Sequence, residues 1–133
     1  MPRVLLNLDV DDLEKAVVFY TRALGLRVGR RFDSGFVELL GAAAPIYLLL
    51  KAAGTEPFEG AEQLRNYARH WTPVHLDFVV DDFDAAVARA VAAGAVLEAT
   101  PSQQVYGRLA LLHDPFGHGF CLLQFQGKGY GEL

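Results

Sequence analysis

The sequence predicts an α+β fold built from two βαβββ modules, and three observations carry that prediction. The segment VDDLEKAV at residues 10–17 has an echo, VDDFDAAV, at residues 80–87. In each copy an apolar, alternating segment is followed by one whose apolar residues have helical spacing. Three further strand-like runs come after each helical segment. We therefore interpret the chain as two copies of one unit.

Length and composition describe a single globular domain, residues 1–133. Hydrophobic residues make up 52% of the chain and charged residues 21%. The formal net charge of −4 argues against a nucleic-acid partner, which would need a basic surface. One cysteine, Cys121, excludes an internal disulfide and a cysteine zinc cluster. The sequence shows no secretory signal and no apolar run long enough to cross a membrane, so we expect a cytoplasmic protein.

Each module is expected to open with a strand, at residues 4–10 and 74–80. Both segments are rich in β-prone residues and alternate with a period of two. Alternation places the odd-numbered residues on one face of each strand, namely Leu5, Asn7, Asp9, His75, Asp77 and Val79. Equivalent residues of the two copies therefore share the same kind of face.

A helix is expected after each of these strands, over residues 13–24 and 83–93. Two aspartates precede each helix, and an acidic residue stands three positions after the first of them, Asp11 or Asp81. This spacing predicts a capping box. A glycine follows each helix, as a left-handed C-terminal cap requires. The paired aspartates are thus interpreted as helix starts and not as catalytic groups.

Six further strands are expected, at residues 26–32, 36–41, 46–51, 95–100, 107–113 and 119–125. The segment PSQQVY, residues 101–106, is interpreted as a turn. The modules then cover about residues 1–51 and 73–126. Residues 52–72 form a polar linker with a short helix near its AEQLRNYARH segment, and residues 127–133 form a Gly-rich tail.

Two short motifs add to this pattern. One is F-Y-x-x-x-L-G-L, and the other is D-P-x-G; their residues are Phe19, Tyr20, Leu24, Gly25, Leu26, Asp114, Pro115 and Gly117. With the two modules they resemble the vicinal oxygen chelate superfamily of glyoxalase I, extradiol dioxygenases, and the fosfomycin- and bleomycin-resistance proteins. The resemblance covers nearly the whole chain. It implies modules that pair into a curved mixed sheet around a shared cleft, helices outside, and a homodimer.

In the metal-dependent members of that superfamily, four ligands come from the first and last strand of each module. The resemblance places them here at Leu5, Tyr47, His75 and Cys121. Only His75 is an ordinary match to the family pattern, because leucine has no lone pair to donate, neutral tyrosine binds metals poorly, and both expected glutamates are missing. We therefore predict no metal cofactor. A divalent ion in a rearranged site, with His75 and Cys121 joined by Asn7, Glu38 or Asp77, stays open as the alternative.

The candidate ligand-binding residues are His75, Asp77, Tyr47, Cys121, Asn7, Glu38 and Trp71. His75 and Asp77 share a strand face, so they could contact a ligand, act as a base with its orienting carboxylate, or only line a cleft. Tyr47 could stack on a ligand or fill space, and Cys121 could be a nucleophile or a core residue. Glu38, if it faces the cleft, is a hydrogen-bond acceptor or a general base with a raised pKa.

A basic and aromatic cluster lies in the linker and consists of Arg65, Tyr67, Arg69, His70 and Trp71. It could cover the cleft or lie in a dimer interface, where such residues are enriched. It could equally be a solvated helix whose tryptophan docks on the core. The sequence leaves the two interpretations open.

These observations predict a small-molecule-binding protein of the glyoxalase and bleomycin-resistance type, without the usual metal quartet. Its expected partner is a small organic ligand in a mostly apolar cleft. The first alternative is a metal-dependent lyase, isomerase or dioxygenase with a rearranged site that uses His75. A second alternative is a domain that serves protein association.

Overall fold

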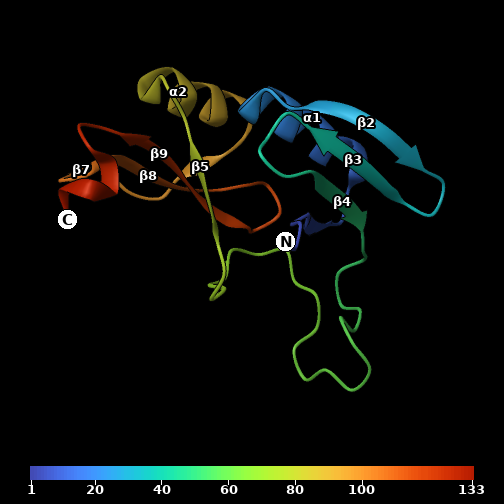
Figure 1. Ribbon diagram of the computed structural model, residues 1–133. Helices are drawn as coiled ribbons and strands as arrows, with labels where there is room; N and C mark the ends of the chain where they lie inside the picture. Colours follow the sequence, from blue (N-terminus) through green and yellow to red (C-terminus); the bar gives the residue numbers. More distant parts are fainter. The chain divides into compact units, whose positions relative to one another are not determined.

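The computed structural model describes residues 1–133 and divides them into two compact units, Met1–Ala68 and Arg69–Leu133 (Figure 1). The boundary falls inside the predicted linker, most of which belongs to the first unit. Each unit contains one α-helix and one mixed β-sheet. The predicted α+β class is confirmed.

The first unit is a four-stranded sheet with one helix. Its elements are β1 (Leu6–Val10), α1 (Leu13–Leu24), β2 (Arg27–Phe32), β3 (Phe36–Leu40) and β4 (Ile46–Leu50). The strand order is β1-β4-β3-β2. Strands β1 and β4 are parallel, and the other neighbours are antiparallel. The first strand therefore lies at an edge of its sheet, beside the last strand of the module.

The second unit repeats this plan with one strand more. Its elements are β5 (Leu76–Val79), α2 (Phe83–Ala93), β6 (Val96–Leu97), β7 (Ser102–Gln104), β8 (Gly107–His113), β9 (Gly119–Phe125) and the 3₁₀ helix η1 (Gly129–Glu132). The strand order is β5-β9-β8-β6, and β7 also pairs with β8. The predicted turn at residues 101–106 is wrong, because half of it pairs with β8 as β7. Of the strand predicted at residues 95–100, only Val96–Leu97 forms a strand, β6.

The 70-residue repeat is present in the structure as well as in the sequence. Strands β1 and β5 begin 70 residues apart, and so do helices α1 and α2. In the parallel register Asn7 faces Tyr47, and Asp77 faces Cys121. Because Asn7 and Asp77 are 70 residues apart, Tyr47 and Cys121 occupy equivalent places in the two sheets.

Both helices are capped at their N-termini by the second aspartate of each pair. Asp12 accepts a hydrogen bond of 3.0 Å from the backbone N–H of Lys15, and Asp82 accepts one of 3.2 Å from Ala85. The predicted capping box is therefore wrong by one residue. The acidic residues Glu14 and Asp84 stand one place too early to complete it, and each pairs with an arginine of its own sheet. Their negative charge still lies in the first helical turn, where the helix dipole favours it.

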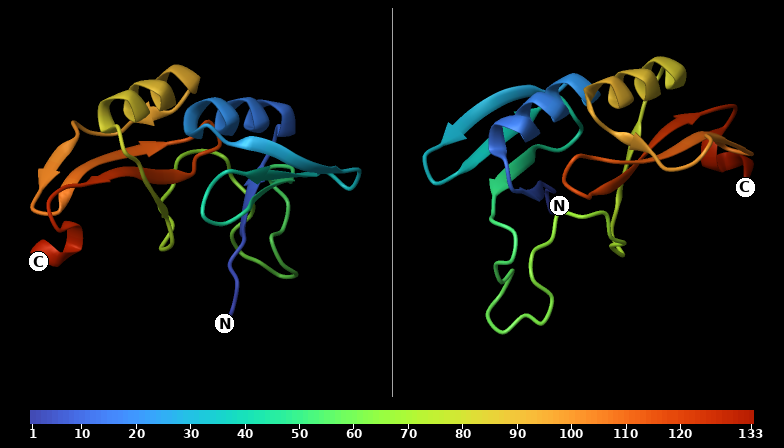
Figure 2. Two further views of the ribbon diagram at one scale, coloured as in Figure 1. Left: turned by 45° about the horizontal axis from the view of Figure 1, so that its top comes forward. Right: turned by 180° about the vertical axis from the view of Figure 1, so that it is seen from behind.

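Each helix covers one face of its own sheet, as Figure 2 shows for α1 and for α2. Between α1 and its sheet lies a core of Val10, Ala16, Phe19, Val37, Leu39, Ile46 and Leu48, all 1% exposed or less. The core of the second unit contains Phe83, Ala90, Ala110, Leu112, Phe116 and Leu122, equally buried. The opposite face of each sheet carries no α-helix. Neither helix has the length and apolarity of a membrane-spanning segment.

The predicted short helix in the linker is wrong. After β4 the chain forms an irregular loop, visible in green in Figure 1. Arg65 closes this loop, because its backbone C=O accepts from Gly54 and its N–H donates to Thr55. Its side chain also forms a 2.9 Å ion pair with Asp9 of β1. Because the backbone N–H and C=O of Arg65 both form hydrogen bonds across the loop, neither group is available for the hydrogen bonds of a helix.

Candidate functional site

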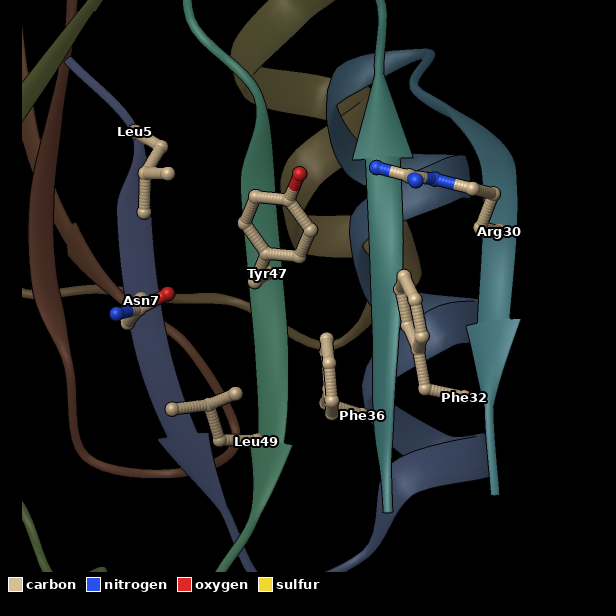
Figure 3. A pocket seen from close by; sticks show the side chains of 7 residues that line it. All are labelled: Leu5, Asn7, Arg30, Phe32, Phe36, Tyr47 and Leu49. Carbon is tan, nitrogen blue, oxygen red and sulfur yellow. The ribbon is translucent and has the colours of Figure 1, made fainter. Parts of the chain in front are cut away.

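The first candidate site is a pocket of about 450 Å³ on the open face of the β1–β4 sheet (Figure 3). In β3 and β4 alternate residues point toward α1, and those between them line the pocket. The lining residues are Leu5, Asn7, Arg30, Phe32, Phe36, Tyr47 and Leu49. Two predicted candidates, Asn7 and Tyr47, thus lie in one pocket, because β1 and β4 are neighbours in register.

Beside this pocket lies a network centred on Glu38. Its carboxylate accepts hydrogen bonds from Tyr47 Oη (2.7 Å) and from Arg30 Nη2 (3.0 Å), Nε (3.2 Å) and backbone N (3.2 Å). These bonds, from Arg30 first and Tyr47 second, lower the pKa of Glu38 to about 2. All of these bonds come from the chain itself, so a role of Glu38 toward a ligand stays a prediction. The predicted raised pKa is wrong, and the lowered pKa makes the carboxylate a weak base.

Glu38 also affects the protonation and the exposure of the charges of its partners, Tyr47 and Arg30. The hydrogen bond to Glu38 and burial both raise the pKa of Tyr47, so its hydroxyl stays protonated. The side chain of Glu38 is 10% exposed, whereas that of Arg30 is 68% exposed. The negative charge is therefore covered and the positive charge faces outward.

An irregularity in β2 directs Arg30 toward Glu38. The register between β2 and β3 shifts between Val28 and Arg31. At this bulge the backbone N–H of Arg30 donates to the Glu38 side chain. A Cβ atom on the neighbouring Gly29 would lie 2.6 Å from Glu38 Oε1, so the approach needs glycine. Bulges often redirect a side chain near a functional site in this way.

Aromatic rings form one wall of the pocket. Phe32 and Phe36 face each other across β2 and β3 and stack with ring centroids 4.0 Å apart and 12° between planes. The Tyr47 ring is tilted against Phe36 at 6.2 Å, and the Arg30 guanidinium lies 5.2 Å from the Phe32 centroid. The pocket therefore combines flat apolar surfaces with one exposed cation.

A second candidate site is a pocket of about 320 Å³ in the second unit. Its lining includes Trp71, His75, Leu109, Leu111, Gly119 and Cys121. Trp71 is 79% exposed, so the expectation that it could dock on the core is wrong. Cys121 is buried, as a core residue would be, yet it also borders this pocket.

His75, Asp77 and Cys121 come together at this second pocket. His75 Nε2 lies 3.3 Å from Asp77 Oδ1, so the contact that strand alternation allows is formed. The nitrogen, oxygen and sulfur atoms of the three side chains lie within 4.8 Å of one another. Burial, and then the charge and hydrogen bond of Asp77, raise the pKa of Cys121 to about 11. The thiol is therefore protonated at neutral pH and is a poor nucleophile without a cation beside it.

The second unit also contains a polar network that no local pattern in the sequence indicates. Arg69 forms an ion pair with Glu98, and His113 Nδ1 lies 2.9 Å from the same carboxylate. Arg69 packs so closely on Gly119 that a Cβ there would lie 2.5 Å from its Nη2 atom. Glu98 lies 29 positions after Arg69 in the sequence, and Gly119 lies farther still, so no local spacing joins these residues. The predicted basic cluster is thus divided: Arg65 and Tyr67 hold the loop of the first unit, and Arg69 and Trp71 border the second pocket.

The four positions that the resemblance assigns to metal ligands do not form a complete donor set. Leu5 has no donor atom, and Tyr47 stays protonated and donates a hydrogen bond to Glu38. His75 and Cys121 keep a nitrogen and a sulfur. The usual quartet therefore does not fit a divalent ion, whereas the three-residue group of the second unit offers one donor of each kind that zinc accepts.

Comparisons with known proteins agree with this fold. The model of the glyoxalase-like domain family matches residues 5–123. The anthracycline biosynthesis protein DnrV of Streptomyces peucetius is 33% identical over 127 residues, which are 93% of this chain. The chain spans only 41% of the length of DnrV.

Solved structures show the same architecture. The fosfomycin resistance protein FosX of Listeria monocytogenes has a TM-score of 0.74 at 19% identity, covering 98% of this chain and 96% of that chain. A glyoxalase/bleomycin resistance protein of Albidiferax ferrireducens has a TM-score of 0.65 at 25% identity, with coverages of 92% and 97%. With its duplicated βαβββ plan and the match over residues 5–123, this chain belongs to the glyoxalase-like family of the vicinal oxygen chelate superfamily.

Proposed function

We propose that this protein binds a small organic molecule in the pocket of its first unit and does not use the metal quartet of its superfamily. The observation that carries the proposal is the Tyr47–Glu38–Arg30 network. The Glu38 carboxylate beside the pocket already accepts four hydrogen bonds and faces a guanidinium. A cation would have to displace Arg30, whereas an organic molecule meets ready-made apolar walls and a few polar groups.

The lining of the pocket supports the same function. Phe32, Phe36 and Leu49 are half-buried, and Leu5 is 53% exposed, so apolar surface is open to a ligand. Burial of such surface is favourable by roughly 25 cal/mol for each Å² removed from water. The name of DnrV, a protein of anthracycline biosynthesis, is compatible with an organic ligand.

A thermal-shift screen of small organic molecules, carried out in the presence of EDTA, tests this proposal. A ligand at 100 times its dissociation constant stabilises the folded state by about 2.7 kcal/mol. The shift should persist in EDTA, disappear in Tyr47→Ala and Phe36→Ala, and remain in the second-unit control Cys121→Ala. The proposal is contradicted if the screen finds no ligand that binds in the presence of EDTA. It is also contradicted if binding is lost in Cys121→Ala but kept in Tyr47→Ala and Phe36→Ala.

The second candidate function is a metal-dependent enzyme of the lyase, isomerase or dioxygenase type. It is favoured by the group of His75, Asp77 and Cys121, whose donor atoms lie within 4.8 Å. These three residues would hold a zinc-type ion. Such an ion, with a position left open, would act as a Lewis acid toward an oxygen of the substrate.

Cobalt titration separates this candidate from the first. Bound Co²⁺ with a thiolate ligand should show a sulfur-to-metal absorption band at one ion per chain. The band should be absent in Cys121→Ser and weakened in His75→Ala, and the first-unit control Glu38→Gln should keep it. If Co²⁺ binds equally well without Cys121, or does not bind, this second function is wrong.

We also propose a homodimer. Strands β1 and β5 both lie at sheet edges, and the exposed apolar residues Val4, Leu5, Val74 and Val79 lie in or beside them. Exposed edges with apolar side chains tend to pair with another chain. Sedimentation equilibrium should give twice the chain mass of 14.6 kDa, and a monomer at micromolar concentration would contradict the proposal.

A further inference from the structure

We infer that the ligand of the first-unit pocket is a flat aromatic molecule that carries an acceptor oxygen, such as a ring carboxylate. This inference rests on the proposed function of the pocket and adds the chemical class of its ligand. It follows from two features of the lining: the free face of a stacked aromatic pair, and a polar edge whose exposed charge is positive.

The aromatic pair leaves one ring face open. Figure 3 shows Phe32 and Phe36 edge-on and side by side, with Tyr47 and Leu49 on the far side of Phe36 from Phe32. One face of Phe36 is therefore covered by Phe32, and the other faces the pocket. A third flat ring could continue the stack there with Leu49 beneath it. Aromatic pairs gain about 0.5–1.5 kcal/mol beyond the burial of their area.

The polar edge selects for an acceptor. Arg30 has five N–H donors, of which Nε and one on Nη2 are used by Glu38. The remaining donors belong to a guanidinium that is 68% exposed. Glu38 has no acceptor to spare, since four hydrogen bonds occupy its two oxygens. A cationic ligand would therefore meet a cation, and an anionic or carbonyl oxygen would meet free N–H groups.

The Asn7 amide completes the edge on the side of β1. It lines the pocket and forms no hydrogen bond within the chain. Because β4 and β3 separate the strands of Asn7 and Arg30, an acid oxygen of the ligand near Arg30 leaves the Asn7 amide for a second polar group at the opposite end of the ligand, with the ring between them on Phe36. The two features thus point to one kind of ligand.

Three probes of similar size test this inference by isothermal titration calorimetry. They are 2-naphthoate, its saturated decahydro analogue, and 2-(aminomethyl)naphthalene. We expect 2-naphthoate to bind about two- to tenfold more tightly than its saturated analogue, and more tightly than the amine. Phe36→Leu should weaken 2-naphthoate by about the same factor and leave the saturated acid nearly unchanged. The double variant Arg30→Gln/Glu38→Gln, which removes both charges together, should abolish the preference for the acid over the amine.

The controls separate this inference from the proposed function. Arg89→Ala, which removes an exposed charge from α2 of the other unit, should leave the affinity for 2-naphthoate unchanged. Equal binding of the flat and saturated acids, or of the acid and the amine, overturns the inference while metal-independent binding in the first-unit pocket still stands. If none of the probes binds, the inference is wrong; if the screen also finds no ligand that depends on Tyr47 or Phe36, the proposed function is wrong as well.

Discussion

Tyr47 donates a 2.7 Å hydrogen bond to Glu38, the residue directly opposite it on β3. In the second unit the equivalent pair is Cys121 and Leu111, which cannot form such a bond. Two copies of one module have thus become chemically different at the same place in the sheet. In the first unit, the Glu38 carboxylate is hydrogen-bonded to Arg30 and Tyr47 beside an aromatic pocket. In the second unit, a thiol lies beside an imidazole and a carboxylate.

The lowered pKa of Glu38 predicts a particular acid sensitivity. A carboxyl whose pKa falls from 4.5 to about 2 on folding stabilises the folded state above pH 4.5. This contribution is lost as the pH falls through the window from 4.5 to about 2. Glu38→Gln should therefore lower the Tm at pH 7, and the difference from the wild type should shrink toward pH 2.5.

The measurement is the Tm of both proteins by circular dichroism across that window. Glu62→Gln, a change in the exposed part of the 51–67 loop, serves as the control and should follow the wild-type curve. A wild-type minus Glu38→Gln difference that stays constant from pH 7 to pH 2.5 would count against the network.

Gly29→Ala should disturb the same network for a steric reason. The new methyl group would lie 2.6 Å from Glu38 Oε1, an oxygen held by two hydrogen bonds from Arg30. We expect a lower Tm and weaker ligand binding. In a double-mutant cycle the same change should cost less in a Glu38→Ala background, because the clash is gone. Additive effects of the two substitutions would show that the contact is unimportant.

The raised pKa of Cys121 predicts slow alkylation. With a pKa of about 11 the thiolate is a very small fraction at neutral pH, so iodoacetamide should react much more slowly than with a free cysteine. The rate should increase about tenfold for each pH unit up to the pKa. Asp77→Asn should accelerate the reaction, since it removes a nearby charge.

Mass spectrometry follows this reaction at a single position, because the chain has one cysteine. The urea-unfolded chain is the control and should react at the ordinary rate. Equal rates for the folded and unfolded chains at pH 7.5 would disprove the predicted protection.

The helix caps can be tested with matched neighbours. Asp12→Ala and Asp82→Ala each remove a side-chain acceptor from a helix N-terminus and should cost about 1 kcal/mol of the free energy of unfolding. Asp11→Ala and Asp81→Ala change the adjacent aspartate without removing a cap, so they should cost less than about 0.5 kcal/mol. Urea denaturation measures all four. Equal losses at both members of a pair would contradict the assigned caps.

The features that the sequence predicted correctly depend on short-range patterns. Alternation identified the face of β1 that carries Asn7, and helical spacing identified α1 and α2 within a residue of their ends. The capping box failed by one residue, because two adjacent aspartates are equally good caps in the sequence. The linker helix failed because Arg65 bonds to residues about ten positions earlier.

By itself, the sequence determined the duplicated βαβββ plan, the helix starts and the residues that share a strand face. These depend on periods of two and 3.6 residues and on caps a few positions apart, which a linear reading resolves. Only the tertiary structure decided that Arg30 binds Glu38, that the acid has a lowered pKa, and that His75 meets Asp77 and Cys121. Those outcomes depend on a bulge in β2 and on pairing between strands far apart in the chain, and no local pattern encodes either of them.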